Sequence, residues 1–284
     1  MVQKKRALLI AISYRELTGY ELAYSHVYCD NLYFFLVKHM GWKPANIRVM
    51  KDDNSIGPRY RPTRENIMRE LIKLSNKTKE GDLSIVYFTG LGSRIDDKDG
   101  DDSDGKDDVL VPIDYQSAGF IIDDDLRIKV LSPLPVNSKM LLIFDTCRGR
   151  MLADLCRVYK VYQETNTNII SISPQLTRRS SAPVLVASRP VSLLQSHDNS
   201  HQPLAANICA LTIYNGTETD DEPNGYLTAA LISVLRSNND LSFCSLLSKI
   251  RDDFDQRRLI NVHPCFAVSK KDDSICLTRV MDFF

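Results

Sequence analysis

The stretch LSIVYFTGLGSRIDDKDGDDSDGKDD, residues 83–108, runs from a short apolar segment through a glycine-rich turn into a run of aspartates. Its apolar part is β-rich and bounded by glycine, which indicates a buried strand. A second stretch of this kind, LLIFDTCRGR at 141–150, ends in Asp145 and Cys147 and continues into Gly149. Because functional residues gather at the ends of such strands, the tip that carries an acid and a thiol is where a nucleophile is expected.

The rest of the chain repeats this alternation of short apolar segments with longer helical ones. Further β-rich segments occur at residues 7–12, 47–50, 109–113, 210–214 and 265–268. Helical spacing of apolar residues occurs at 22–38, 64–74, 226–236 and 241–254, and Pro62-Thr63 supplies a helix start before the second of these. Strands that alternate with helices predict an α/β fold with a mostly parallel central sheet and helices on both faces.

The composition excludes several classes of protein. The chain has 284 residues, of which 36 are basic and 36 acidic, while 43% are hydrophobic and 25% charged. These proportions are typical of a globular protein and argue against disorder, coiled coil and collagen-like repeats. A net charge of zero argues against nucleic acid or an anionic membrane as the main partner. No apolar stretch approaches the roughly 20 residues that a membrane span requires.

Cysteine usage and the N-terminus indicate a reducing compartment. The seven cysteines are odd in number and form no CxxC pair, so we expect neither a disulfide framework nor a zinc site. The segment VQKKRALLIAISYRE, residues 2–16, has an apolar run of only about eight residues and no cleavage site, which favours a strand over a signal peptide. We therefore expect a cytoplasmic protein, with the nucleus as an alternative.

One domain over residues 1–284 is predicted, divided by a linker. Between about 159 and 206 the apolar pattern weakens into polar residues that include Arg178-Arg179 and the stretch 195–202. We interpret this stretch as a surface linker, interrupted by one short strand at 184–187, between a larger and a smaller part of the domain.

The aspartate run has two interpretations. Between Asp96 and Asp108, eight of thirteen residues are aspartate, and carboxylate oxygens are the ligands that calcium prefers. The spacing fits no register of an EF-hand, since in a loop starting at Asp97 the required glycine falls on Asp102. A solvated acidic loop is the simpler interpretation of composition alone. A second acidic cluster lies at 123–125, and spacing does not show whether the two meet.

Cys147 is the candidate nucleophile, although a cysteine at the end of a strand is more often structural. Arg148 and Arg150 would stabilise its thiolate, and the neighbouring glycines would let backbone N–H groups approach a substrate carbonyl. A catalytic cysteine also needs a base, usually histidine. The motifs contain none, and His26 and His263 are the only candidates of any weight among the five histidines of the chain.

Taken together, these motifs resemble those of the type I metacaspases, which are caspase-fold cysteine proteases. ALLIAISYRE (7–16) resembles the first strand of the family, and PTRENIMREL (62–71) resembles the start of its PTRANI-type helix. Residues 86–126 resemble, without a gap, the family block that begins YSGHGSQ and ends DDE. IFDTC (143–147) is similar to the IFDSC that carries the nucleophile. The resemblance implies a caspase-like α/β fold, a peptidase C14 domain without a prodomain, and a monomer.

The same resemblance argues against ordinary protease activity. The family's catalytic histidine lies between two glycines, and here that position is Leu91. Leucine cannot accept a proton, and a positioned general base contributes about 10²–10⁴-fold to the rate. The resemblance retains the nucleophile at Cys147 and an oxyanion-binding position at Gly92. Because the base is missing, efficient turnover is not expected.

The pocket for a basic side chain is altered as well. The family selects Arg or Lys with carboxylates, and Asp145 and Thr89 match two of its pocket residues. Ser25 and Tyr28 stand where the family has a cysteine and an aspartate, which removes one carboxylate. A further family block is replaced by YNGTE at 214–218. Specificity for basic residues is therefore doubtful.

Calcium is the cofactor that the resemblance implies. The family holds its activating calcium with four aspartates, and all four matching positions are aspartate here: Asp107, Asp123, Asp124 and Asp154.

Three functions remain open at this stage. The first is a pseudoprotease that keeps the scaffold and the calcium site and binds a protein or peptide partner, such as an active metacaspase or a substrate of one. The second is a divergent calcium-dependent cysteine endopeptidase that cleaves after Arg or Lys with another base, His26 or His263. The third is a redox sensor, in which Arg148 and Arg150 lower the pKa of the Cys147 thiol.

Overall fold

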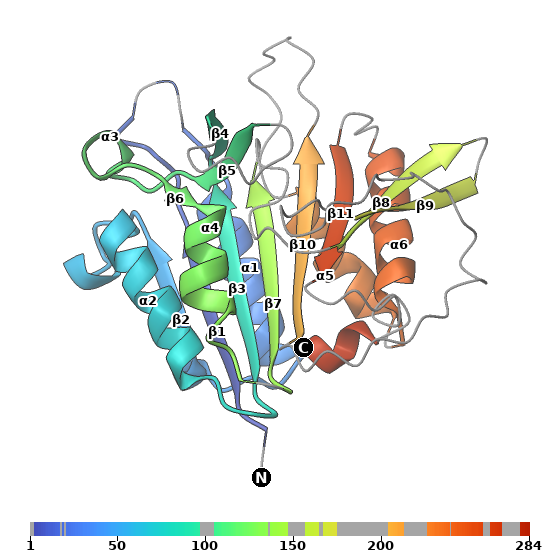
Figure 1. Ribbon diagram of the computed structural model, residues 1–284. Helices are drawn as coiled ribbons and strands as arrows, with labels where there is room; N and C mark the ends of the chain where they lie inside the picture. The colour runs from blue at the N-terminus through green and yellow to red at the C-terminus, as the bar shows by residue number, and fades with distance from the viewer. Residues whose placement is uncertain are drawn as a thin grey trace.

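The computed structural model describes residues 3–17, 19, 21–96, 105–135, 137–146, 157–164, 167–174, 204–212, 226–238, 240–257, 262–268 and 279–284. Among these residues an eight-stranded sheet forms the centre of the fold (Figure 1). Its strands, in spatial order, are β2 (Ile47–Lys51), β1 (Lys5–Ala11), β3 (Leu83–Gly90), β7 (Lys139–Thr146), β10 (Leu204–Thr212), β11 (Val262–Val268), β8 (Arg157–Glu164) and β9 (Thr167–Pro174).

The sheet is parallel in its first five strands and antiparallel beyond them. Strands β2, β1, β3, β7 and β10 run in one direction, and β11, β8 and β9 pair antiparallel. A second sheet of three short strands, β4 (Gly92–Asp96), β5 (Lys106–Leu110) and β6 (Ile121–Ile122), lies beyond the end of β3. The predicted mostly parallel sheet is therefore confirmed, with an antiparallel extension.

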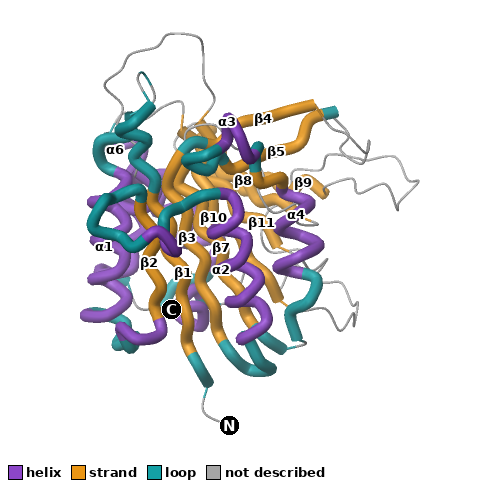
Figure 2. The backbone as a smooth tube through the Cα atoms, turned by 90° about the vertical axis from the view of Figure 1, so that its left-hand side faces the viewer, coloured by secondary structure: helices purple, strands orange, loops and turns teal. Residues whose placement is uncertain are grey.

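Helices cover both faces of the sheet, as predicted. One face carries α1 (Ser25–Lys38), α5 (Tyr226–Ser237) and α6 (Phe243–Gln256); the other carries α2 (Arg64–Lys77), α4 (Asp123–Leu126) and the π-helical turn Arg127–Leu131. Figure 2 shows α1 and α2 on opposite sides of the strands. The short helix α3 (Tyr115–Ala118) connects β5 to β6.

Alternation along the strands builds the two cores. In β1, Ala7, Leu9 and Ala11 belong to the apolar cluster under α1, α5 and α6, whereas Leu8 and Ile10 belong to the cluster under α2 and α4. Successive side chains of a strand point to opposite faces, so a strand between two helical layers must be apolar at every position. This explains why the strands read as continuous apolar runs in the sequence.

Local signals fix the start of α2. The Thr63 hydroxyl accepts a hydrogen bond from the backbone N–H of Asn66 at 3.2 Å, which satisfies one of the unpaired donors at the beginning of a helix. The helix starts at Arg64, as the Pro62-Thr63 pair predicts.

Three sequence predictions differ from the structure. The strand expected at 109–113 lies at Lys106–Leu110. The stretch from 159 to 206, interpreted as a linker, begins with the hairpin of β8 and β9, while the strand expected at 184–187 lies outside the described residues. Cys244, expected to be reduced, is disulfide-bonded. None of the helices in the described ranges is both long enough and apolar enough to cross a membrane.

Candidate functional site

The carboxyl ends of β3 and β7 bring the two sequence motifs together. Thr89 pairs in register with Asp145, and Gly90 pairs with Thr146. Asp145 and Thr89 are buried, and Leu91 and Gly92 follow directly in the chain. Cys147 and the residues 148–150 lie outside the described residues. Thr89 and Asp145, which the family resemblance assigns to the pocket, are therefore neighbours at the end of the parallel sheet.

Leu91 is held in place by Tyr14. The Tyr14 hydroxyl accepts a hydrogen bond from the Leu91 N–H at 3.0 Å and donates one to the Val111 carbonyl at 2.5 Å. Val111 in turn donates its N–H to the Leu91 carbonyl at 3.1 Å. The partly buried Leu91 side chain packs against the apolar cluster under α2 and α4. The position therefore has a defined backbone but no group that can accept a proton.

Gly90 lets Tyr14 approach this closely. A Cβ atom at position 90 would lie 3.0 Å from the Tyr14 hydroxyl and 2.9 Å from the Phe88 ring. Gly92 begins β4 and pairs with Leu110 of β5. Gly90 therefore serves the packing of the β3–β4 turn, while Gly92 is the oxyanion-binding position implied by the family resemblance.

Asp145 is bound by the first turn of α5. Its Oδ2 accepts hydrogen bonds from the Thr228 backbone N–H at 2.9 Å and from the Thr228 hydroxyl at 2.5 Å. The Tyr87 hydroxyl lies 2.8 Å from that of Thr228. Burial and the nearby Asp145 carboxylate raise the pKa of Tyr87 well above its ordinary value, so Tyr87 is a neutral phenol. Sequence reasoning did not find Thr228, which lies 83 residues from Asp145.

The first turn of α1 borders the same region. Ser25 is fully buried, and its hydroxyl makes no hydrogen bond to any residue that the structure describes. Burial, followed by the Asp145 carboxylate, raises the pKa of the Tyr28 phenol. A neutral Tyr28 thus stands beside Asp145 where the resemblance places a second carboxylate, and the negative charge of the pocket is reduced.

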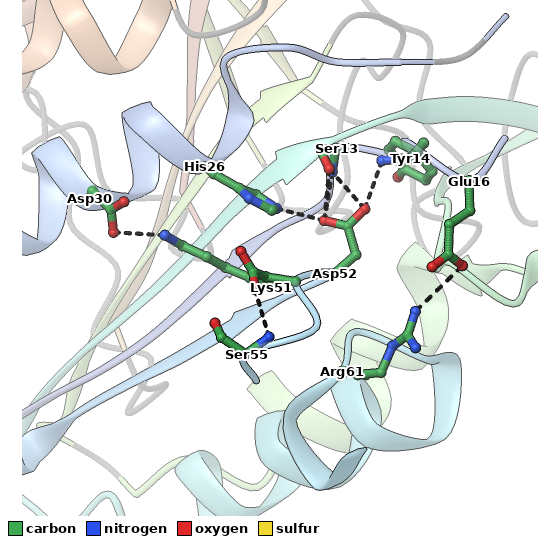
Figure 3. Close-up of polar contacts among 10 residues, drawn as sticks. Ser13, Tyr14, Glu16, His26, Asp30, Lys51, Asp52, Ser55 and Arg61 are labelled. Atoms are coloured by element: carbon green, nitrogen blue, oxygen red, sulfur yellow. Dashed lines mark hydrogen bonds and ion pairs between the residues drawn. The ribbon is translucent and has the colours of Figure 1, made fainter. Parts of the chain in front are cut away.

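A histidine–aspartate pair lies at the same edge of the sheet (Figure 3). His26 Nε2 is 2.6 Å from Asp52 Oδ1, and both side chains are largely buried, with 14% and 7% exposed. Asp52 also accepts the backbone N–H groups of Ser13 and Tyr14 at 2.8 and 2.7 Å. Burial alone would raise the pKa of Asp52, but hydrogen bonds from His26, Ser13 and Tyr14 outweigh it, and the pKa is lowered.

Asp52 is also connected to Leu91 through Tyr14, whose N–H donates to Asp52 and whose hydroxyl accepts the Leu91 N–H. Tyr14 has a φ of 53°, a left-handed conformation that residues other than glycine rarely adopt. Its N–H is held by Asp52 and its hydroxyl by Val111. In the sequence, His26 was a weak candidate for the base, and its partner Asp52 was not predicted. The Asp52-Asp53 pair at the end of a predicted strand could have indicated a functional acid there.

The predicted calcium ligands are only partly described. Asp107 on β5 and Asp123 on α4 are buried, and Asp123 accepts the backbone N–H groups of Asp108 and Asp124 at 3.4 and 3.2 Å. Asp124 forms an ion pair with Arg127. Asp154 lies outside the described residues. Within the described ranges, no three histidine, cysteine or acidic side chains come close enough together to hold a metal ion.

Comparison with known proteins agrees with this layout. A solved protein of Geobacter sulfurreducens superposes over 98% of both chains with a TM-score of 0.59 at 16% identity, which supports the fold alone. The class defined by the fold and by the β3 and β7 motifs is that of the caspase-like α/β proteins. The family model "Metacaspase, peptidase C14 domain" matches residues 5–156.

The chain therefore belongs to the metacaspases of peptidase family C14, and its relatives are type I members. Metacaspase-1 of Kluyveromyces lactis is 35% identical over 160 residues, which cover 55% of this chain and 36% of that protein. Metacaspase-1 of Pyricularia oryzae is 26% identical over 272 residues, or 88% of this chain and 68% of the relative. The chain thus spans from about a third to two thirds of these two relatives.

Proposed function

We propose that this metacaspase is a pseudoprotease, which binds a protein or peptide partner at the carboxyl edge of its sheet and turns over substrate slowly or not at all. The observation that carries the proposal is Leu91. Its backbone is fixed by Tyr14 and Val111, and its side chain packs into the core. The family resemblance assigns this position to the catalytic histidine. No movement of this side chain can supply a base.

The pocket supports the same proposal. Its remaining carboxylate, Asp145, already accepts two hydrogen bonds from Thr228. A basic side chain of a substrate would have to compete with donors that are fixed at the beginning of α5. With Tyr28 replacing the second acid, the ion pairing that selects Arg or Lys is weakened.

Calcium binding belongs to the proposal as well. Asp107 and Asp123 are buried carboxylates on adjacent elements, which is the hard oxygen donor type that calcium prefers. Asp124 would have to leave Arg127 to join them, and Asp154 would supply the fourth carboxylate. Calorimetric titration of the full chain with calcium tests this, with Asp123→Asn as the ligand variant and Asp240→Asn, at an exposed carboxylate, as the control. Equal binding by all three proteins would contradict it.

An electrophilic arginyl-ketone probe tests the loss of activity. The full chain is incubated with the probe, with and without millimolar calcium, and covalent labelling is followed by mass spectrometry. We expect little labelling in either condition. Rapid, calcium-dependent labelling that disappears in Cys147→Ala would show an active protease and overturn the proposal.

The divergent protease is the second candidate, and the His26–Asp52 pair favours it. A histidine bound to a buried carboxylate through one ring nitrogen has the arrangement of a catalytic base, because the carboxylate fixes the ring and stabilises its charged form. If the probe labels Cys147 and His26→Ala abolishes labelling in a folded protein, His26 is the base. If labelling survives His26→Ala, this candidate fails. A redox role of Cys147 stays a prediction, and a thiol pKa near the ordinary ~8.5 would eliminate it.

A further inference from the structure

We infer that the groove between α1 and α5 is a docking site for an extended peptide segment that alternates carboxylate and apolar side chains. This peptide is the kind of partner that the proposed binding role requires, so the inference rests on the proposed function. It concerns the outer surface of the two helices.

The groove is formed where α1 and α5 pack side by side on one face of the sheet. It has a volume of about 360 Å³ and a mostly polar lining. The side chains that could hold a peptide come from both helices: Tyr28, Asn31, Ile232, Ser233, Arg236 and Ser237. Amide and hydroxyl groups can pair with a peptide backbone, while Ile232 offers an apolar floor.

An exposed apolar strip on α1 borders the groove. The described residues include four large hydrophobic side chains that are strongly exposed. Val27 and Phe34, exposed by 50% and 55%, lie on α1, and Tyr24, exposed by 50%, is the N-cap residue of this helix. They fall on one helical stripe with Tyr28 and Asn31, because residues three and four apart share a face. Such a cluster beside a groove indicates an interaction surface rather than ordinary surface.

The charges of this surface are positive. Arg236 is the only charged side chain among the described residues that line the groove, and it is exposed. Lys38, also exposed, lies on the same stripe of α1. The nearest acid on α1, Asp30, is paired with Lys51 at 2.7 Å. A carboxylate is therefore the complementary group for a partner.

Tyr28 joins this groove to the candidate site. Its ring lines the groove, and its phenol is within electrostatic reach of Asp145. A peptide lying across the end of the sheet can therefore continue along α1 into the groove. A second copy of the chain fits this surface less well, since a symmetric contact would bring two positively charged patches together.

Two capped pentapeptides that differ only in charge test the inference. One alternates leucine with glutamate and the other leucine with lysine, with acetylated and amidated ends. Dissociation constants for the full chain are measured by calorimetry or by backbone chemical-shift perturbation. We expect the glutamate peptide to bind about tenfold more tightly than the lysine peptide, because Arg236 and Lys38 attract the glutamates and repel the lysines.

Variants locate the binding. Arg236→Glu should remove or invert the preference for glutamate, and Phe34→Ser should weaken both peptides. Arg236→Gln serves as a second variant, because a glutamate at the C-terminal end of α5 is itself unfavourable. The controls are Lys77→Glu on α2 and Ile128→Ser, the remaining exposed large apolar residue, and neither should change the affinities.

Three outcomes would overturn the inference. The first is equal affinity for the two peptides. The second is a preference for the glutamate peptide that persists in both folded Arg236 variants. The third is a concentration-dependent dimer that Phe34→Ser abolishes. The last result would assign the surface to a second copy. The arginyl-ketone experiment tests the proposed function independently. If Cys147 is labelled and the glutamate peptide is still preferred, the pseudoprotease proposal fails but the docking site stands. If Cys147 is not labelled and the preference is absent, only the docking site is refuted.

Discussion

The Tyr14 hydroxyl accepts a hydrogen bond from the backbone N–H of Leu91 at 3.0 Å, across 77 residues of sequence. Through this contact, the segment that follows β1 holds the β3–β4 turn in place. The same hydroxyl donates to Val111, so one buried phenol connects three segments of the chain at the position that the family resemblance assigns to the catalytic histidine.

Tyr14→Phe should destabilise the protein. The change leaves the Leu91 N–H and the Val111 carbonyl without their partner, which typically costs about 1–3 kcal/mol in the free energy of unfolding. Urea denaturation measures it. Tyr115→Phe is the matched control, because the Tyr115 hydroxyl forms no hydrogen bond with the described residues. Equal unfolding midpoints for the two variants would contradict the support role.

Leu91→His should restore proteolysis if the remaining site is intact. A positioned general base is worth about 10²–10⁴-fold in rate, and Tyr14 already fixes the backbone at this position. Cleavage of arginyl and lysyl peptide substrates is measured with calcium present. Leu91→Gln is the control, because it adds a polar group of similar size that is no base. No gain from histidine would indicate that the pocket around Asp145 and Tyr28 no longer accepts these substrates.

Asp52 should contribute to stability at neutral pH and lose its contribution in acid. Its pKa is lowered in the folded state, so its stabilising effect is fully present above the unfolded value of about 3.9 and is lost as the pH falls through the lower folded value. The difference in unfolding free energy between the wild type and Asp52→Asn should therefore shrink below about pH 4. Asp240→Asn, at an exposed carboxylate, should show no such convergence. A difference that stays constant down to pH 3 would be inconsistent with a lowered pKa.

Thr228→Val should loosen the attachment of α5 to the site. The substitution removes the hydroxyl that binds Asp145 and Tyr87 but keeps the size of the side chain. We expect a loss of about 1–3 kcal/mol, measured by denaturant unfolding, because a buried carboxylate loses a donor. Ser237→Ala, at an exposed hydroxyl on the same helix, should change stability little. A neutral Thr228→Val would mean that Asp145 is satisfied by other donors.

Cys29 should be inert in the folded protein. Burial raises the pKa of its thiol to about 12, and only the thiolate reacts with alkylating agents. Iodoacetamide at pH 8, followed by peptide mapping, should modify Cys29 only after the protein is unfolded in urea. Modification of the native protein at the rate seen in urea would show that α1 opens readily.

Much of the fold could be predicted because its signals are local. The apolar runs at 83–88 and 140–144 lie within β3 and β7, and the helices expected at 64–74 and 226–236 lie within α2 and α5. Each signal is complete within a few residues, since period and capping are properties of neighbouring positions. The hairpin of β8 and β9 was missed because its strands mix polar residues such as Arg157 and Asn168 into the pattern.

Half of the candidate site could be predicted for the same reason. Thr89 and Asp145 lie at the ends of two recognisable strands, and parallel pairing places such ends side by side. The partners that decide their chemistry could not be predicted, because contacts such as Asp145 with Thr228 and His26 with Asp52 join segments far apart in the sequence.

The sequence by itself determined the alternation of strands and helices, the absence of a histidine between Gly90 and Gly92, and the positions of the acidic residues. The tertiary structure decided which of these groups are free to act. It placed the Asp145 carboxylate on the first turn of α5, bound the N–H of Leu91 to Tyr14, and paired His26 with Asp52. The physical reason is burial: most polar groups in a protein interior are hydrogen-bonded, and the fold, not the local sequence, decides which partner comes within hydrogen-bonding distance.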